Sequence, residues 1–202
     1  PSVTASKPVQ VKLTTDSGII VLMLYDKTPL HRNNFVKLIK EHFYDGLLFH
    51  RVVRDFMIQG GDPESRNAKP GVLLGESSLK YTIPAEFDTA LFHKRGALAA
   101  AREGDDTNPK KTSSSTQFYI VEGQTYTNSQ LDKIEERNNI SIPENHRKVY
   151  ETQGGTPFLD MNYTVFGEVL SGMDVVEKIA KAPKDENNRP LRDIKMNMTI
   201  IN

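Results

Sequence analysis

One short stretch of the chain, residues 49–62, combines side chains that rarely share a strand or a loop. It reads FHRVVRDFMIQGGD, with a guanidinium at Arg51, an amide at Gln59 and large apolar groups at Phe56 and Met57. Because arginine keeps its proton in proteins, this set is poorly suited to acid–base chemistry. It is well suited to holding oxygen atoms with the guanidinium fork and an apolar ring between hydrophobic side chains. The stretch therefore indicates a binding pocket with a polar edge.

Other catalytic chemistries lack the residues that they need. The chain has no cysteine, which excludes disulfides, thiolate catalysis and cysteine-based zinc sites. It has no G-x-S-x-G nucleophile elbow, and its five histidines show no H-E-x-x-H spacing. The Gly60-Gly61 pair is not followed by the G-K-[ST] of a phosphate-binding loop, so it indicates a tight turn. We expect neither a metal nor a cofactor.

The composition is that of a globular protein without a strongly charged partner. The 202 residues are 37% hydrophobic and 26% charged, and 26 Lys and Arg balance 26 Asp and Glu. Zero formal net charge argues against nucleic acid as a partner. No run of apolar residues is long enough for a transmembrane helix. We expect a monomer with one domain at 9–202, preceded by a flexible segment at 1–8.

The sequence pattern predicts several short strands and few helices. Eight segments have strand-like patterns, and they lie at residues 9–13, 19–25, 47–53, 56–59, 96–101, 117–121, 163–169 and 195–201. One helix is predicted from Pro29 to His42 behind an N-cap at Thr28, and another opens with a capping-box pattern at Ser171 and ends near Lys181. With no regular βαβ rhythm, we predict a mainly-β fold, a closed eight-stranded antiparallel barrel capped by two α-helices.

Two polar regions interrupt the strand pattern. Residues 122–155 carry helix-start signals at Ser129 and Ser141, and a Gly-Gly pair stops the second helix. We interpret this region as an insertion of one or two short helices, too small to have a core of its own. Residues 102–115 are expected to form a flexible polar loop.

The opening stretch resembles the signature of the cyclophilins, the peptidyl-prolyl cis-trans isomerases. The hallmark of that family is F-H-R followed by F-M-x-Q-G-G-D, and every one of these letters is present. Further matches occur downstream in family order, and they are Gly96–Ala101, Thr116–Ile120, Phe158–Asp160 and Val165–Gly167, with a matching helix start at Thr28–Phe35. The resemblance covers roughly residues 9–121 and 156–201. The insertion and the loop after Arg102 depart from it.

The resemblance implies a role for each matching position. Arg51 matches the catalytic arginine. The implied substrate-binding residues are Phe56, Met57, Gln59, Ala101, Arg102, Gln117, Tyr119, Phe158, Leu159 and Tyr163. Four of these differ from the residue common in the family, with Arg102 for Asn, Tyr119 for Phe, Phe158 for Trp and Tyr163 for His.

Two of these differences have physical consequences. Tyr119 must place a hydroxyl in or beside an apolar slot, which costs free energy unless the hydroxyl finds a partner. Phe158 lacks the indole N–H of the tryptophan that is associated with cyclosporin binding, so weak cyclosporin sensitivity is expected.

His50 is expected to be structural, and Arg54 to be a solvated turn residue.

The resemblance favours an isomerase of Xaa-Pro peptide bonds that assists folding and acts on proline-containing peptides and unfolded chains. The alternative is a cyclophilin-like module that binds proline peptides or acts as a chaperone with little turnover. Retention of Arg51 favours the enzyme, while the altered aromatic positions and the insertion keep the alternative open. A role of the insertion in partner binding or gating is a further possibility. The sequence leaves the compartment open, although the start at Pro1 and the lack of cysteine favour the bacterial periplasm or cell envelope over the cytoplasm.

Overall fold

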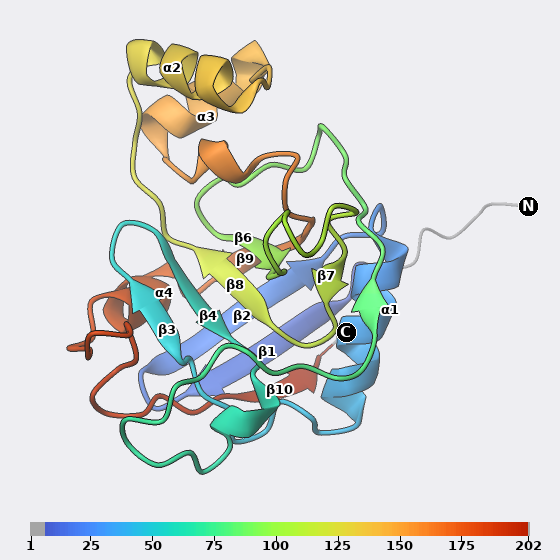
Figure 1. Cartoon of the computed structure of the whole chain (residues 1–202), viewed down its shortest axis with the longest axis vertical. Helices are drawn as coiled ribbons and strands as arrows, with labels where there is room; N and C mark the ends of the chain where they lie inside the picture. The colour runs from blue at the N-terminus through green and yellow to red at the C-terminus, as the bar shows by residue number, and fades with distance from the viewer. Residues whose placement is uncertain (1–6, 202) are drawn as a thin grey trace, which may run out of the picture.

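The centre of the molecule is one antiparallel sheet that curls strongly on itself (Figure 1). The computed structural model describes residues 7–201, so most of the segment expected to be flexible, residues 1–6, lies outside the described range. The eight strands are β1 (Gln10–Thr15), β2 (Gly18–Leu24), β3 (Arg51–Val53), β4 (Met57–Gly60), β6 (Ala97–Ala100), β8 (Phe118–Val121), β9 (Val165–Ser171) and β10 (Asn197–Ile200). Their order is β10-β1-β2-β9-β6-β8-β4-β3. All eight predicted strands are therefore present.

The prediction of a closed barrel is wrong, because the sheet remains open between β3 and β10. Among the described residues these two end strands form no ladder with each other. Backbone bonds just before them draw the edges together, since Phe49 N–H donates to Ile194 at 3.0 Å and Met196 N–H donates to Leu47 at 2.9 Å. The strand predicted over 47–53 is thereby reduced to its last three residues. The sheet is a curled half-barrel whose seam consists of irregular chain.

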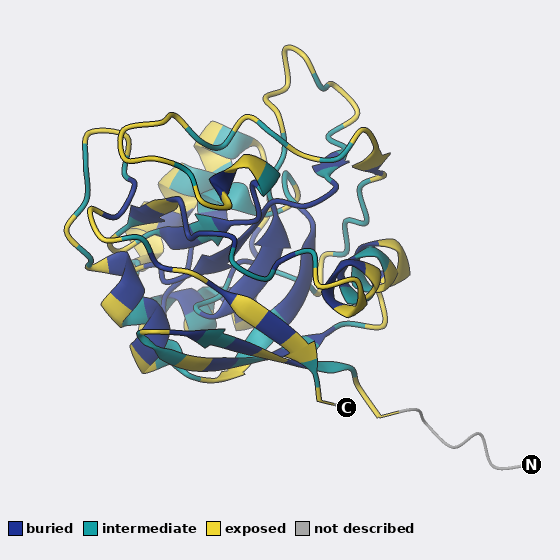
Figure 2. Ribbon diagram, turned by 90° about the horizontal axis from the view of Figure 1, so that it is seen from below, coloured by how far each residue is buried: buried dark blue, intermediate teal, exposed yellow. Residues whose placement is uncertain are grey.

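Two helices lie at opposite ends of the curled sheet, α1 (Pro29–Lys40) and α4 (Met173–Ala180) (Figure 1). Their apolar faces enter the same buried cluster as the inward residues of the strands, and Figure 2 shows the strands as the buried centre of the molecule. The capping box expected at Ser171 is absent. Gly172 is the N-cap instead, at φ 98°, and a side chain there would approach the Ile19 carbonyl to 2.4 Å. The close approach of β2 therefore requires glycine at this helix start.

Strands β6 and β8 are buried on both faces. Leu98, Ala100, Phe118 and Ile120 belong to the main core inside the curl. The intervening residues Ala97, Ala99, Tyr119 and Val121 belong to a second cluster on the outer face, with Met57 and Val165. Because successive side chains of a strand point to opposite faces, each short strand contributes to two different packing layers.

The region 122–155, predicted to form one or two short helices, forms two, α2 (Asn128–Asn138) and α3 (Glu144–Thr152), which project at one end of the molecule (Figure 1). Their starts differ from prediction. The capping box of α2 is formed by Thr127 and Gln130, and α3 begins after Pro143. The buried side chains of this segment, Leu131, Ile142 and Tyr150, pack against Phe92 of the main domain. None of the described helices is long and apolar enough to cross a membrane.

The N-terminus of α1 is capped by a residue far away in the sequence. Thr28 makes no side-chain capping bond. Instead the carboxylate of Glu86 accepts the Leu30 N–H at 3.1 Å and the His31 N–H at 2.8 Å, and it lies 2.7 Å from His31 Nδ1. The other ring nitrogen of His31 lies 2.7 Å from the Ser113 hydroxyl. A carboxylate at a helix N-terminus satisfies free N–H groups and complements the helix dipole.

We predict that Glu86→Gln lowers the free energy of unfolding by about 1–3 kcal/mol, since one amide oxygen replaces two charged acceptors. Urea denaturation at pH 7 measures this change. Glu136→Gln on the exposed side of α2 is the matched control, because Glu136 makes no hydrogen bond or ion pair to any described residue. Equal shifts of the urea midpoint in the two variants would contradict the capping role.

Candidate active site

The alternation of strand faces explains the mixed composition of the stretch FHRVVRDFMIQGGD. Val52 and Ile58 belong to the core inside the curl. Arg51, Met57 and Gln59, one residue away from them, therefore lie on the opposite, outer face. The strand register places Arg51 across from Gln59 and Gln59 across from Tyr119. Three predicted site residues thus form one row across β3, β4 and β8.

A cavity of about 140 Å³ lies over this row on the outer face. Nine of the predicted site residues line it, and they are Arg51, Phe56, Met57, Gln59, Ala101, Arg102, Tyr119, Leu159 and Tyr163. They come from strands β3, β4 and β8, from the end of β6, and from η2 (Pro157–Leu159) with the residues that follow it. The tertiary fold brings these scattered positions around one small cavity with an apolar floor and a guanidinium at its edge.

A relay of amide groups orients Arg51 at the edge of the cavity. Gln117 Nε2 donates to the carbonyl oxygens of Gly75 and Ser77, at 2.9 and 2.7 Å. Its oxygen is therefore free to accept from Gln59 Nε2 at 3.0 Å, so that the oxygen of Gln59 faces Arg51 Nη1 at 3.2 Å. Each amide thus has its orientation set by the next. Gln117 itself lies in a second cavity and not in the smaller one.

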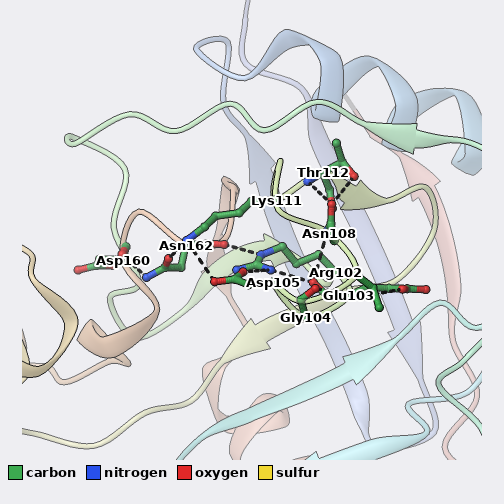
Figure 3. Close-up of polar contacts among 10 residues, drawn as sticks. Arg102, Glu103, Gly104, Asp105, Asn108, Lys111, Thr112, Asp160 and Asn162 are labelled. Atoms are coloured by element: carbon green, nitrogen blue, oxygen red, sulfur yellow. Dashed lines mark hydrogen bonds and ion pairs between the residues drawn. The ribbon is translucent and has the colours of Figure 1, made fainter.

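The side chain of Arg102 is held in place and is not free to bind a ligand with its charge. Figure 3 shows its guanidinium between the Asn162 carbonyl, at 2.7 Å, and the Asp105 carboxylate, at 2.8 Å. It also stacks over the ring of Tyr163, with 4.5 Å from the guanidinium carbon to the ring centroid. Arg102 therefore shapes the cavity wall, and it fixes the ring of Tyr163.

Side chains of the polar loop 102–115 bind backbone groups within the loop. Asn108 donates to the Thr112 carbonyl at 2.8 Å and accepts from the Thr112 N–H at 3.1 Å (Figure 3). Lys111 is hydrogen-bonded to the side-chain oxygen of Asn162, close to the pocket residue Tyr163. These bonds hold the loop beside the cavity, while its flexibility stays a prediction.

The hydroxyl of Tyr119 has a hydrogen-bond partner behind the cavity. It lies 2.7 Å from Nε2 of His93, whose side chain is completely buried. Burial raises the pKa of Tyr119 well above its usual value. The ring of Tyr119 can therefore face the cavity as an apolar floor while its polar end is satisfied inside the protein.

Phe158 does not line the small cavity. Its ring packs against Phe56 in an edge-on arrangement, with 5.7 Å between the centroids. It therefore supports the cavity wall from outside, and its contact with substrate stays a prediction.

A second and larger cavity adjoins the first. It measures about 610 Å³, and Gln59, Ala101 and Arg102 line both cavities. The rest of its lining is mostly polar and comes from residues 75–78, from Thr82 and from residues 103–117. The outer face thus offers a small apolar hollow that continues into a wide polar groove.

Comparison with known proteins gives the family. Residues 10–200 match the family described as "Cyclophilin type peptidyl-prolyl cis-trans isomerase/CLD". The chain belongs to this family. Relatives of this cyclophilin include a "Putative peptidyl-prolyl cis-trans isomerase" of Staphylococcus saprophyticus, 36% identical over 92% of this chain and 88% of the relative. A protein of the same name from Staphylococcus haemolyticus is 34% identical over 92% and 87%.

Solved structures support the same fold. A Cryptosporidium parvum cyclophilin type peptidyl-prolyl cis-trans isomerase superposes with a TM-score of 0.70 at 21% identity, over 97% of this chain and 99% of that one. A second crystal structure of that protein, in the presence of the dipeptide Ala-Pro, has a TM-score of 0.68 at 20% identity. At this identity the likeness shows the fold alone.

Sequence reasoning about this cyclophilin missed the residues that support the pocket from below. His93 carried no recognisable signal, since its partners are distant in the sequence. Asp160 lies in the family match Phe158–Asp160, but the sequence does not indicate what it does. The carbonyls of Gly75 and Ser77, which orient the amide relay, belong to a loop in which no motif was found.

His50, which is expected to be structural, is almost fully buried. It is 3% exposed, and neither ring nitrogen has a hydrogen-bond partner among the described residues. Burial lowers the pKa of His50 to about 4, although the nearby Asp62 partly opposes the shift. The folded protein therefore holds a neutral imidazole at pH values where an unfolded chain would protonate it.

This arrangement makes stability depend on pH. Between pH 6.5 and pH 4 the unfolded chain binds a proton that the folded protein does not, so stability is full above pH 6.5 and falls as the pH falls towards 4. We predict that on going from pH 7 to pH 4.5 the wild type loses about 2–3 kcal/mol more of its unfolding free energy than His50→Leu does. Urea titrations at the two pH values measure the difference. Equal losses in the wild type and in His50→Leu would contradict the prediction.

Proposed function

We propose that the protein catalyses the cis–trans isomerisation of Xaa-Pro peptide bonds, in proline-containing peptides and unfolded chains, with Arg51 as the catalytic residue. The observation that carries the proposal is the guanidinium of Arg51 at the edge of a small apolar cavity, oriented by Gln59. Its other N–H groups have no partner in the part of the protein that the structure describes. They are available to a peptide at that edge.

The reaction needs no nucleophile, since no covalent bond is made or broken. Amide resonance sets a rotation barrier of about 18–20 kcal/mol. When the bond twists, resonance is lost and the proline nitrogen regains a lone pair. A hydrogen bond from Arg51 to that nitrogen is available in the twisted state and is nearly absent in the planar one. Such a difference lowers the barrier, and about 1.4 kcal/mol accelerates the reaction tenfold.

The apolar part of the cavity is suited to hold the proline ring while the bond rotates. Phe56, Met57 and Leu159 provide walls, and the ring of Tyr119 provides the floor. Because the Tyr119 hydroxyl is satisfied by His93, an apolar ring entering the cavity does not have to desolvate it. A fixed ring leaves the other side of the amide to move.

The backbone at Arg102 and the large polar cavity are placed to hold the flanking peptide. The Ala101 N–H already donates to Gln117, and its carbonyl accepts from Ser114, so Ala101 contributes its side chain. The N–H and carbonyl of Arg102 have no protein partner among residues 7–201. They can pair with an extended peptide that runs from the small cavity into the larger one.

We predict that Arg51→Ala lowers the rate of catalysed exchange by roughly 10²–10³-fold, comparable to removing one preorganised donor from a transition state. Exchange NMR on a short Ala-Pro peptide, with catalytic amounts of protein, measures the rate. Arg54→Ala is the matched control, because Arg54 is exposed on the turn after β3 and, among the described residues, its charge is paired only with Asp55 at 4.0 Å. It should retain wild-type activity.

The same experiment distinguishes the alternative function. If the peptide signals broaden on binding while the cis–trans exchange stays at its uncatalysed rate, the protein is a binding module for proline peptides. Loss of activity in Arg54→Ala equal to that in Arg51→Ala would instead point to a general effect of positive charge.

A further inference from the structure

A buried polar relay joins the floor of the pocket to the helical segment α2–α3. It begins at the Tyr119 hydroxyl, 2.7 Å from His93 Nε2. Nδ1 of His93 lies 2.9 Å from Asp160 Oδ1, which also accepts the His93 backbone N–H at 2.8 Å. The second carboxylate oxygen accepts the hydroxyl of Tyr150, on α3, at 2.6 Å. Four side chains from four separate segments thus form one continuous chain of hydrogen bonds.

The carboxylate of Asp160 sets the direction of two of these bonds. A carboxylate accepts only, so Asp160 receives hydrogen bonds from Tyr150 and from Nδ1 of His93. A hydroxyl can donate or accept, so the Tyr119 hydroxyl pairs with Nε2 of His93 in either protonation state of that nitrogen. Every polar group in the relay is matched, and both tyrosines are buried enough that their pKa values are raised. Removing any member leaves a buried group without its partner.

Helix α3 also holds the neighbour of His93 by packing. The ring of Phe92 stacks on His146 at 3.8 Å between centroids and meets Tyr150 edge-on at 5.5 Å. Residues 92 and 93 are therefore held by α3 twice, once through aromatic contact and once through Asp160. The displacement of α3 would be transmitted to the group that anchors the pocket floor.

We propose that His93 and Asp160 are positioning residues for the proline pocket. Through Tyr150, the affinity of this pocket for a proline peptide depends on the position of α3. The inference rests on the proposed function of the pocket, but it concerns peptide binding and not turnover. It assigns the helical segment a role in tuning the pocket from behind, on the side away from the substrate. None of the relay residues except Tyr119 lines the cavity, so the effect on substrate must pass through the Tyr119 ring.

A double-mutant cycle on the two tyrosines tests the coupling, since each Tyr→Phe substitution removes only a hydroxyl. The dissociation constant of an Ala-Pro peptide is measured by NMR titration of the wild type, Tyr150→Phe, Tyr119→Phe and the double variant. We expect Tyr150→Phe to weaken binding by roughly 3- to 10-fold in the wild-type background, and by less than about twofold when Tyr119→Phe has already detached the relay from the pocket. Equal weakening in both backgrounds, or none in the wild type, would overturn the proposal.

Tyr126→Phe is the matched control within the same helical segment. Tyr126 packs, half-buried, against the same small apolar cluster as Tyr150, and its hydroxyl makes no hydrogen bond to a described relay residue. Its backbone N–H donates to the Tyr150 carbonyl at 3.1 Å, a bond that the substitution retains. Its substitution should leave the dissociation constant unchanged. Weakening equal to that of Tyr150→Phe would show that the segment acts only through general stability, and would overturn the proposal.

A second measurement needs no variant on α3. The ring signals of Tyr150 are followed by NMR as the Ala-Pro peptide saturates the pocket, and they should shift in the wild type and remain in place in Tyr119→Phe. Unmoved signals in the wild type would overturn the coupling. Failure of the wild type to accelerate exchange would refute the isomerase function alone, because the cycle and the shifts depend only on binding. Failure of the wild type to bind the peptide would overturn both.

Discussion

The pocket depends on one row of cross-strand neighbours on the outer face of the sheet. Arg51, Gln59, Tyr119 and Ala99 face one another in turn across β3, β4, β8 and β6. A slip of one residue in any of these pairings would move that strand's contribution to the opposite face. The register is secured from inside the curl, where Val52, Ile58, Leu98 and Ile120 fill the main core. Each core residue is adjacent in the sequence to a residue of the row. Packing of the core therefore fixes which side chains face the pocket.

Side chains that bind backbone groups organise the irregular segments around this row. Glu86 caps α1 from a loop, Gln117 holds the loop at 75–77 through two carbonyls, and Arg102 holds the carbonyl of Asn162. Backbone groups buried outside helices and strands need such partners. In this cyclophilin two of these side chains, Gln117 and Arg102, also line the cavities. The interactions that order these loops therefore also shape the site.

The polar floor residue shows how a cyclophilin pocket can tolerate a hydroxyl. Tyr119 requires a buried acceptor, His93 requires a group that holds its other nitrogen, and Asp160 completes both. Each buried polar side chain behind the pocket needs a hydrogen-bond partner, which is the next side chain of the relay. The last of these is Tyr150 of α3, whose hydroxyl donates to Asp160. The helical segment is thereby connected to the chemistry of the site, although it lies at one end of the molecule.

The sequence by itself determined the eight strands of the main sheet, the two main helices, the helical character of residues 122–155 and the set of residues that surround the small cavity. Strand periodicity is local, and the signature FHRVVRDFMIQGGD places its polar and apolar residues on alternate faces without reference to the rest of the chain. The predicted helix starts were wrong where a residue distant in the sequence determines the N-terminus of the helix. Thr28 was expected to cap α1, and the Glu86 carboxylate caps it. Ser171 was expected to start α4, and the close approach of Ile19 requires Gly172 there.

Only the tertiary structure decided that the sheet stays open, that Arg102 is tied to Asp105 and Asn162, and that the Tyr119 hydroxyl turns away from the cavity. Most of these outcomes depend on contacts between residues distant in the sequence. His93 lies 26 positions from Tyr119 and 67 from Asp160, and Arg102 lies 60 positions from Asn162. Local periodicity carries no information about which distant side chain arrives beside a buried polar group. The free energy of satisfying that group selects the partner, and this selection takes place only when the sheet has brought the segments together.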